Sequence, residues 1–106
     1  MEEQVYNYLI MNHIGKDNLI KNIDLRKRFN IGSDKSMRKI IQNIREDKRF
    51  YLIVGSISGK SGGFYICHTE EEIDDTISNI NNRAIQMLYM CKRLREKKKR
   101  TIDEQH

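Results

Sequence analysis

Apolar side chains recur at helical spacing in two short segments near the start of the chain. A first helix is expected over residues 2–14. Its inward face consists of Val5, Tyr8 and Leu9. A second, shorter helix is expected over residues 25–29, because Asp24 is a suitable cap and Leu25 and Phe29 share one face. Between the two helices, residues 19–20 predict a strand of one or two residues.

A turn and a third helix follow. The turn is Asn30-Ile31-Gly32, since Asn and Gly tolerate left-handed backbone. Ser33 is then expected to cap a helix that runs to about Asp47. Its apolar positions have the spacing i, i+3, i+4 and i+7, which forms a narrow stripe on one side of a helix. The stripe consists of Met37, Ile40, Ile41 and Ile44.

Two β-rich runs come next, at residues 51–54 and 64–67. Between them, residues 55–63 are rich in Gly and Ser, with Lys60 near the tip. Two such runs joined by a flexible loop predict a β-hairpin. The fold class expected from this order is mainly α with a β-hairpin wing: a winged helix-turn-helix domain over residues 1–68, followed by a long C-terminal helix.

The C-terminal helix is expected over residues 69–100, with a tail at 101–106. Thr69 and Glu72 have the spacing of a capping box, which marks its start. Apolar residues then alternate at steps of four and three, the heptad period of helices that pair. This seam consists of Ile73, Ile77, Ile80, Ala84, Met87, Cys91 and Leu94. Residues 92–100 are basic and are expected to fray.

The seam predicts a homodimer, because a helix of roughly 45 Å is longer than the domain of about 30 Å diameter that precedes it. The expected dimer contacts are Ile77, Ile80, Ala84, Met87, Cys91 and Leu94. A parallel pairing would bring the two Cys91 side chains together, whereas an antiparallel pairing about Ala84 would place Ile77 beside Cys91 of the partner subunit. Alternatively, the helix folds back on its own domain through Ile85, Leu88 and Tyr89.

Charge is unevenly distributed along the chain, whose net charge is +5. Residues 21–50 contain ten Lys or Arg against four Asp or Glu, and residues 92–100 contain seven against one. The five acids within residues 70–75 are interpreted as the solvated start of a helix. A basic middle and a basic end on a small chain favour a polyanionic partner.

The outward face of the third helix carries most of the candidate contacts. At about 100° per residue, Lys35, Lys39, Gln42 and Glu46 lie opposite the apolar stripe, flanked by Arg38 and Asn43. Basic side chains bind phosphates and amides read base edges, although an ordinary solvated helix can carry the same residues. The candidate nucleic-acid-binding residues are Lys35, Ser36, Arg38, Lys39, Gln42, Asn43, Arg45 and, in the hairpin loop, Lys60.

Catalytic, cofactor and metal sites are not predicted, so the chain is not expected to be an enzyme. Gly59-Lys60-Ser61 lacks the upstream glycine of a P-loop and leads into a strand rather than a helix. Cys67 and Cys91 have no CxxC spacing and are expected to be reduced thiols of a cytoplasmic protein. The sequence contains no apolar run long enough to cross a membrane, and no secretory signal is expected.

Three segments are similar to a known family. They are IGSDKSMRKII at 31–41, GGFYI at 62–66 and TEEEI at 69–73, followed by a long helix that ends in Lys and Arg. In these segments the chain resembles small winged-helix DNA-binding proteins encoded by phages and prophages of low-GC Gram-positive bacteria. Gly32 departs from the family by lengthening the usual turn by one residue. The resemblance implies a phage DNA-binding role in the cytoplasm of the host cell.

Two functions are therefore expected as alternatives. In the first, the protein binds double-stranded DNA through a major-groove helix and a basic wing, and acts in transcription regulation or replication. In the second, it is a phage-encoded inhibitor or protein-interaction module, for example of the anti-CRISPR type, which uses the same scaffold to dock on a host or phage protein. The sequence alone does not separate the two.

Overall fold

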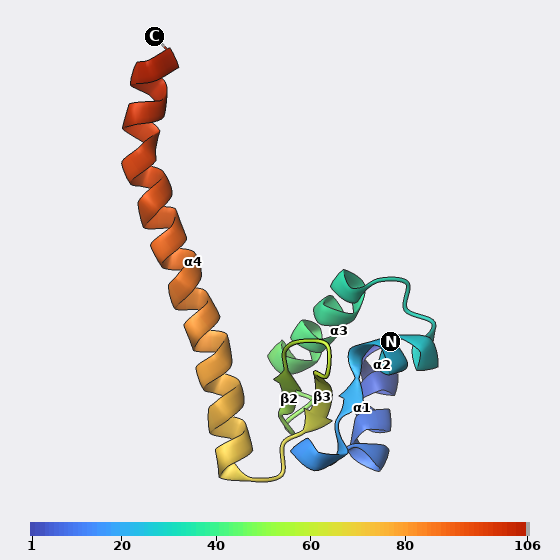
Figure 1. The fold of residues 1–106 in the computed structure, drawn as a ribbon. Helices are drawn as coiled ribbons and strands as arrows, with labels where there is room; N and C mark the ends of the chain where they lie inside the picture. The colour runs from blue at the N-terminus through green and yellow to red at the C-terminus, as the bar shows by residue number, and fades with distance from the viewer. Residues whose placement is uncertain (106) are drawn as a thin grey trace. The chain divides into compact units, whose positions relative to one another are not determined.

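The structure, a computed structural model, describes residues 1–105 and is mainly helical, with a small antiparallel sheet and a long C-terminal helix (Figure 1). Its contacts divide the chain into two units, Met1–Thr76 and Ile77–His106. The elements in chain order are α1 (Glu2–Asn12), the 3-10 turn η1 (Lys16–Asn18), β1 (Ile20–Lys21), α2 (Asn22–Phe29), α3 (Asp34–Glu46), β2 (Val54–Ile57), β3 (Gly63–Ile66) and α4 (Glu70–Gln105).

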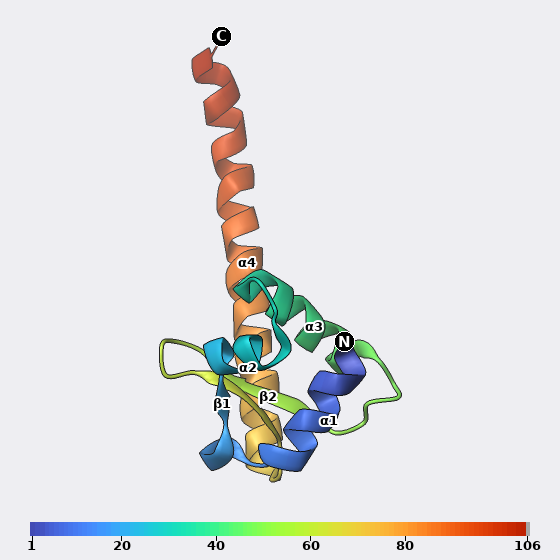
Figure 2. The ribbon, with the colours of Figure 1, turned by 90° about the vertical axis from the view of Figure 1, so that its right-hand side faces the viewer.

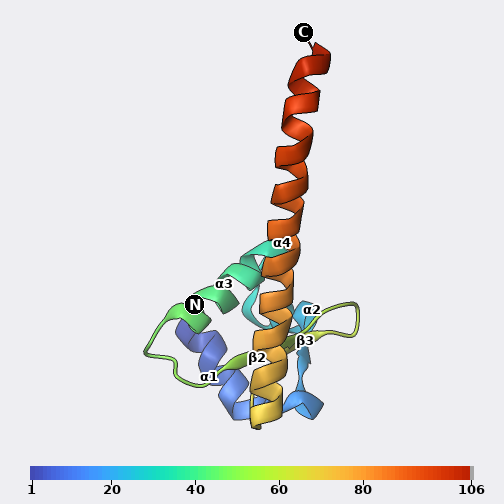
Figure 3. The ribbon, with the colours of Figure 1, turned by 90° about the vertical axis from the view of Figure 1, so that its left-hand side faces the viewer.

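The sheet has three strands in the order β1-β3-β2, and all neighbours are antiparallel. The β2–β3 hairpin pairs Val54 with Ile66 at one end and Ile57 with Gly63 at the other. The two-residue β1 pairs with the opposite edge of β3. The loop between β2 and β3 projects from the sheet (Figures 2 and 3). The first unit thus combines three short helices with a hairpin whose tip lies free.

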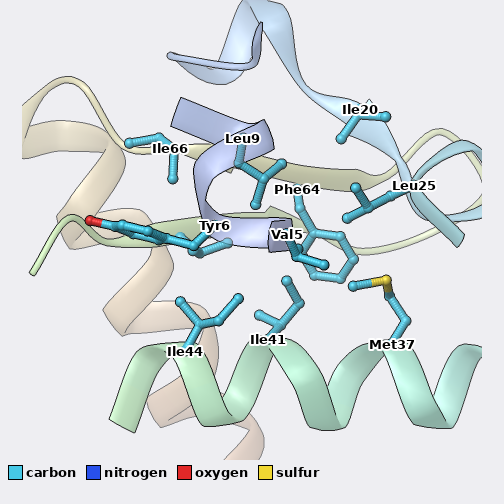
Figure 4. Packing of buried hydrophobic residues seen from close by; sticks show 11 residues of the cluster. Val5, Tyr6, Leu9, Ile20, Leu25, Met37, Ile41, Ile44, Phe64 and Ile66 are labelled. Atoms are coloured by element: carbon cyan, nitrogen blue, oxygen red, sulfur yellow. The ribbon is translucent and has the colours of Figure 1, made fainter. Parts of the chain in front are cut away.

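The core of the first unit lies between α1, α3 and the sheet (Figure 4). Side chains from these elements interdigitate and are almost completely withdrawn from solvent, which is the main favourable contribution to the stability of a domain of this size. The members of this cluster are Val5, Tyr6, Leu9, Ile20, Leu25, Met37, Ile41, Ile44, Val54, Phe64 and Ile66. Every secondary-structure element of the first unit except η1 and the start of α4 contributes to it.

The first helix forms as predicted, but its buried tyrosine is Tyr6 and not Tyr8. Tyr6 is 6% exposed, whereas Tyr8, which was expected inward, is half-buried. The centroid of the Tyr6 ring lies 4.7 Å from that of Phe50, with the two rings tilted by 50°. The Tyr6 hydroxyl accepts a hydrogen bond of 3.1 Å from the backbone N–H of Leu52. The segment after α3 therefore determines which tyrosine is buried, and this contact spans more than forty residues of sequence.

The second helix begins at Asn22, three residues before the expected start. The expected cap Asp24 lies inside its first turn instead, and the side chain of Asn22 is hydrogen-bonded to Asp34 at the start of α3. The helix ends at Phe29, and the left-handed backbone of its C-cap Asn30 (φ 55°) confirms the predicted turn, while Gly32 is not left-handed.

Ser33 caps α3 as predicted, because its hydroxyl accepts a hydrogen bond of 3.1 Å from the N–H of Ser36. Within the predicted apolar stripe, Met37, Ile41 and Ile44 are buried and Ile40 packs on the edge of the core. The third helix was therefore the element that the hydrophobic period defined best, both in its bounds and in its inward face.

The first strand of the hairpin lies later in the chain than predicted. Residues 51–53 are outside β2, with Tyr51 83% exposed, and Gly55 and Ser56 belong to the strand. Gly55 pairs with Tyr65, and a Cβ at position 55 would lie 2.5 Å from the Tyr65 ring. Glycine is typical of loops, but here its missing side chain makes room for an aromatic ring in the neighbouring strand.

Both hydrogen bonds of the capping box that begins α4 are formed. The N–H of Glu72 donates to the Thr69 hydroxyl at 3.1 Å, and the Glu72 carboxylate accepts from the N–H of Thr69 at 3.4 Å. The same carboxylate accepts from the N–H groups of Lys16 (2.8 Å) and His68 (2.7 Å). Glu72 therefore ties the start of α4 to η1, a role that the local capping pattern did not reveal.

The helix α4 is longer than predicted and runs without interruption to Gln105. Residues 92–105 are helical, so the helix extends beyond its predicted end at residue 100 into the segment expected to be a tail, of which residue 106 lies outside the described residues. The chain contains no Gly or Pro after Gly63, so nothing in the backbone stops the helix. Among residues 1–105, no helix combines the length and apolar character required to cross a membrane.

The fit of Gly55 against Tyr65 predicts a cost for the smallest side chain. Gly55→Ala is expected to destabilise the protein by about 1–3 kcal/mol, because the ring cannot retreat without disturbing the core. Gly32→Ala is the matched control, since nothing lies within 4 Å of a Cβ at that position and its φ is not positive. Urea denaturation measures both, and equal stability of the two variants would contradict the prediction.

The hydrogen bonds to Glu72 predict a pH dependence of stability. The three backbone N–H groups, that of Lys16 foremost, hold the pKa of this carboxyl below its ordinary value of 4.5. A carboxyl with a lowered pKa in the folded state contributes stability above its unfolded pKa and loses it as the pH falls. Glu72→Gln is therefore expected to cost about 0.5–2 kcal/mol at neutral pH, and less as the pH falls below 4.5.

Thermal melts at neutral and acidic pH measure this difference. Glu71→Gln, at an exposed position in the same helical turn, serves as the control and is expected to change little at either pH. A loss of stability in Glu72→Gln that stays constant down to pH 3 would contradict the assignment.

Candidate nucleic-acid interface

The rotation of α3 determines which of the predicted contact residues face solvent. Because Met37, Ile41 and Ile44 point into the core (Figure 4), the opposite side of the helix is exposed. The exposed candidates on α3 are Lys35, Ser36, Arg38, Lys39 and Gln42. Together they form the outer face of α3, a surface with three cationic groups, an amide and a hydroxyl.

Asn43, one of the predicted base-reading residues, is occupied by the fold. It is half-buried, and its side-chain amide donates a hydrogen bond of 2.9 Å to the carboxylate of Glu2. This hydrogen bond lowers the pKa of Glu2. Asn43 thus joins α3 to the start of α1, and its amide is already bound.

Arg45, predicted to bind nucleic acid, contacts the hairpin. Its guanidinium donates through Nε (3.0 Å) and Nη2 (2.8 Å) to the carbonyl oxygen of Val54, and through Nη2 (3.1 Å) to the hydroxyl of Ser56. Both acceptors lie on β2, so the last turn of α3 is fastened to the first strand of the hairpin. The planar guanidinium suits this double contact with one carbonyl better than a lysine ammonium would.

The remaining residues of the outer face make only local contacts. Arg38 forms an ion pair with Asp34 one turn earlier, and Gln42 donates a hydrogen bond of 3.0 Å to Glu46 one turn later. Exposed contacts of this i, i+4 type contribute a few tenths of a kcal/mol and exchange readily with other partners. Arg38 and Gln42 are therefore available to a ligand at little cost.

Lys60 lies exposed in the five-residue loop that joins β2 to β3. The loop turns at Gly59, whose φ of 100° is easily adopted only by glycine, and the N–H of Gly62 donates to the Gly59 carbonyl at 3.0 Å. The loop leads into β3 rather than into a helix, so Gly59-Lys60-Ser61 does not stand at the helix N-terminus that a P-loop requires. A cation at a projecting hairpin tip is instead suited to reach a phosphate beside the domain.

Two residues that the sequence did not single out shape the turn between α2 and α3. The guanidinium of Arg26 donates a hydrogen bond of 3.0 Å to the carbonyl oxygen of Gly32, and Asn22 contacts Asp34. Arg26 thus links the middle of α2 to the turn, and Asn22 links the start of α2 to the start of α3. No sequence pattern marks these side chains, because the contacts appear only once the turn has closed.

The described part of the chain forms no metal centre, and its partly buried cysteine, Cys67, is held away from the thiolate form. Residues 1–105 contain no group of three or more His, Cys, Asp or Glu placed to hold a metal ion. Burial raises the pKa of the Cys67 thiol, whose sulfur lies 3.8 Å from the hydroxyl of Thr76, and this disfavours the nucleophilic thiolate. His68, its neighbour, is exposed.

Comparison of the chain with protein-family models, with curated proteins and with solved structures found no match. The functional argument therefore rests on the chemistry of the outer face of α3 and on the architecture that presents it.

The contacts of Arg45 predict that this residue supports the fold. Arg45→Ala is expected to destabilise the protein by about 1.5–3 kcal/mol, the range for hydrogen bonds from a charged group to partly buried acceptors. Arg45→Lys should recover only part of this loss, because an ammonium cannot reproduce the fork. Arg38→Ala removes the same charge from the exposed side of α3 and is expected to change stability by less than about 0.5 kcal/mol.

Chemical denaturation of the three variants measures these differences. Equal stability of Arg45→Ala and Arg38→Ala would contradict the structural role of Arg45.

Proposed function

We propose that residues 1–76 form a winged helix-turn-helix domain that binds double-stranded DNA, with α3 in the major groove. The element order α1, β1, α2, α3, β2, β3 and the sheet order β1-β3-β2 support the assignment. In winged domains the helix that follows the turn reads the groove, and the hairpin lies beside it against the backbone. The helix α3 and the β2–β3 hairpin correspond to these two parts.

One observation carries this proposal. The polar side chains on the outer face of α3 make no contacts that hold the fold together, whereas the polar side chains on either flank of this face do. Asn43 on one flank is bound to α1, and Arg45 on the other is bound to β2. Between these flanks, no side-chain hydrogen bond or ion pair to the rest of residues 1–76 is formed by Lys35, Lys39 or Gln42, apart from the local bond from Gln42 to Glu46. These side chains are therefore available to a ligand, and their position on the helix that follows the turn favours nucleic acid as that ligand.

The chemistry of this face suits a DNA groove. The major groove is about 12 Å wide and admits an α-helix. Lys35 and Lys39 are one turn apart and can each neutralise a phosphate, while Gln42 can offer its amide to the N6 and N7 edge of adenine. Arg38 can exchange its exposed ion pair with Asp34 for a phosphate or a guanine. Lys60 supplies a further phosphate contact from the hairpin tip.

The biological role that we propose is that of a phage protein acting in transcription regulation or replication. It rests on the resemblance of residues 31–41, 62–66 and 69–73 to phage winged-helix proteins. The alternative, docking on a host or phage protein, needs no exposed row of cations on α3.

Salt dependence of DNA binding tests the proposal. With four phosphate contacts, by Lys35, Arg38, Lys39 and Lys60, the logarithm of the binding constant for a random duplex should fall with a slope of about −3.6 against log[salt]. Fluorescence anisotropy of a labelled duplex at several salt concentrations gives the slope. Absence of binding at low salt would overturn the proposal and favour a protein partner.

Single substitutions then locate the interface. Lys39→Ala is expected to weaken binding to all duplexes and to reduce the slope by about 0.9. Lys16→Ala is the matched control, because it removes the same exposed charge from η1 and leaves intact the backbone bond from Lys16 to Glu72. An equal effect of the two substitutions would show that general charge, and not α3, drives binding.

Base reading has its own test. On a duplex obtained by selection from random sequence, Gln42→Ala should lose about 1–3 kcal/mol of discrimination at one base pair. Its affinity for random duplex should stay close to that of the wild type. Equal losses on both duplexes would remove the base-reading role from Gln42.

A further inference from the structure

The second unit consists of the greater part of α4 and leaves large apolar side chains in contact with solvent. Ile77, Met87 and Leu94 are 56%, 66% and 58% exposed. Others along the same helix are also exposed, namely Ile80, Ile85, Leu88, Tyr89, Met90 and Ile102. Such a concentration on one helix marks an interaction surface, since monomeric proteins rarely expose apolar groups so densely.

The period of these residues identifies the kind of partner. In heptad notation, Ile77, Ala84 and Cys91 occupy a positions, and Ile80, Met87 and Leu94 occupy d positions. Such a seam fits another helix with the same period, and α4 itself is one. At the next a position stands Lys98, so the apolar seam ends there although the helix continues to Gln105. The partner helix therefore needs an apolar seam of the same length.

Charge along α4 indicates the direction of pairing. Its first turns carry the exposed acids Glu70, Glu71, Asp74 and Asp75, whereas residues 92–100 carry seven Lys or Arg. A parallel pair would gather the acids of both copies at one end and the bases of both at the other, and crowding of like charge destabilises the pair. An antiparallel pair brings the acidic start of each helix to the basic end of the other.

We propose that α4 pairs with α4 of a second copy of this chain as an antiparallel two-helix coiled coil. The side-chain sizes along the seam support this direction. When each a position faces a d position of the other copy, Ile77 lies opposite position 94, Ile80 opposite position 91, and Ala84 opposite position 87. Each of the smaller residues, Ala84 and Cys91, then faces a larger one, which fills the layer.

A parallel pair would pack the same residues less well. It places Ala84 against Ala84 and Met87 against Met87 in successive layers, so one layer is underfilled and the next is crowded. It also places the two Lys98 ammonium groups against each other at the end of the seam. The antiparallel arrangement avoids both problems with the same sequence.

The residues beside the seam agree with this register. Asp74 and Arg95 both occupy e positions, and in antiparallel coiled coils e positions of the two helices face each other. Asp74 of one copy therefore lies beside position 95 of the other, and the pair occurs twice by symmetry. Leu88 and Met90 widen the apolar contact at e and g, where they face Asn81 and the aliphatic stem of Arg83.

Sedimentation of the full chain without DNA tests whether the pair forms. The wild type is expected to be a dimer at high micromolar concentration, and Met87→Glu is expected to be a folded monomer. Gln86→Glu is the matched control, because it adds the same charge one residue away, at a c position outside the seam, and should remain dimeric. A monomeric wild type overturns the proposal, as does a Met87→Glu variant that stays dimeric while its circular dichroism is unchanged.

A charge exchange tests the direction. Asp74→Arg places two arginines together at each end of an antiparallel pair and is expected to weaken the dimer by about ten-fold, since the two symmetric pairs add. Adding Arg95→Asp restores opposite charges and should recover the wild-type dissociation constant. In a parallel pair e positions face g positions, so residues 74 and 95 of the two copies do not meet and the second change cannot compensate for the first. Failure of the second change to restore the dimer therefore overturns the antiparallel register.

Cysteine crosslinking gives an independent measure of the register. In the antiparallel pair the two Cys91 thiols lie well apart, and mild oxidation of the wild type should leave the chains unlinked. In Ile80→Cys the introduced thiol faces Cys91 of the partner subunit, so a peptide joining positions 80 and 91 is expected by mass spectrometry. A disulfide between the two Cys91 residues would establish a parallel pair instead. Because DNA is absent from all three experiments, their failure is distinguishable from failure of DNA binding.

Discussion

The burial of Met37, Ile41 and Ile44 fixes the rotation of α3 about its own axis, and the rest of the first unit is arranged around that constraint. An amphipathic helix has one orientation in which its apolar stripe is removed from water, and any other rotation exposes it. Once that orientation is taken, Lys35 and Lys39 must point outward. The core and the outer face of α3 are thus two sides of one packing choice.

Packing alone sets the rotation of α3, and polar contacts hold its position between its neighbours. Asn43 bonds to Glu2 on α1, and Arg45 bonds to the Val54 carbonyl on β2. In the proposed complex the helix and the hairpin would therefore meet DNA as one rigid body, because Arg45 in the last turn of α3 is hydrogen-bonded to the base of the hairpin. A domain with so small a core benefits from such contacts, since each hydrogen bond from a charged group adds about 1.5–3 kcal/mol.

The hydrophobic period was sufficient to predict α3, its Ser33 cap and the presence of all four α-helices, because these depend on neighbours in sequence. The errors lie where distant residues decide. Tyr6 replaced Tyr8 in the core because Phe50 and Leu52 come from the far side of α3. The first hairpin strand shifted because Gly55 faces the ring of Tyr65. The predicted end of α4 at residue 100 is too early, because a basic composition does not stop a helix and no helix-breaking residue occurs there.

For the candidate site, the sequence was enough to place Lys35, Lys39 and Gln42 on one exposed face, since helical geometry alone relates them to the stripe. It could not distinguish them from Asn43 and Arg45, which have the same chemistry but bond to α1 and β2. Composition does not reveal whether a polar group already has an acceptor. The contacts of Arg26 and Asn22 could not be predicted for the same reason, because their partners come within reach only when the turn has closed.

The separation between occupied and unoccupied polar residues on α3 has a consequence for how this protein can evolve. Asn43 and Arg45 carry folding contacts, so their replacement draws on a stability margin that is small in a domain of this size. Lys35, Lys39 and Gln42 carry almost none, and helix surfaces accept many residue types at those positions. Selection can therefore change what the outer face recognises without first acquiring compensating mutations in the core. A lineage of such chains would diverge fastest at these three positions while its fold stayed the same.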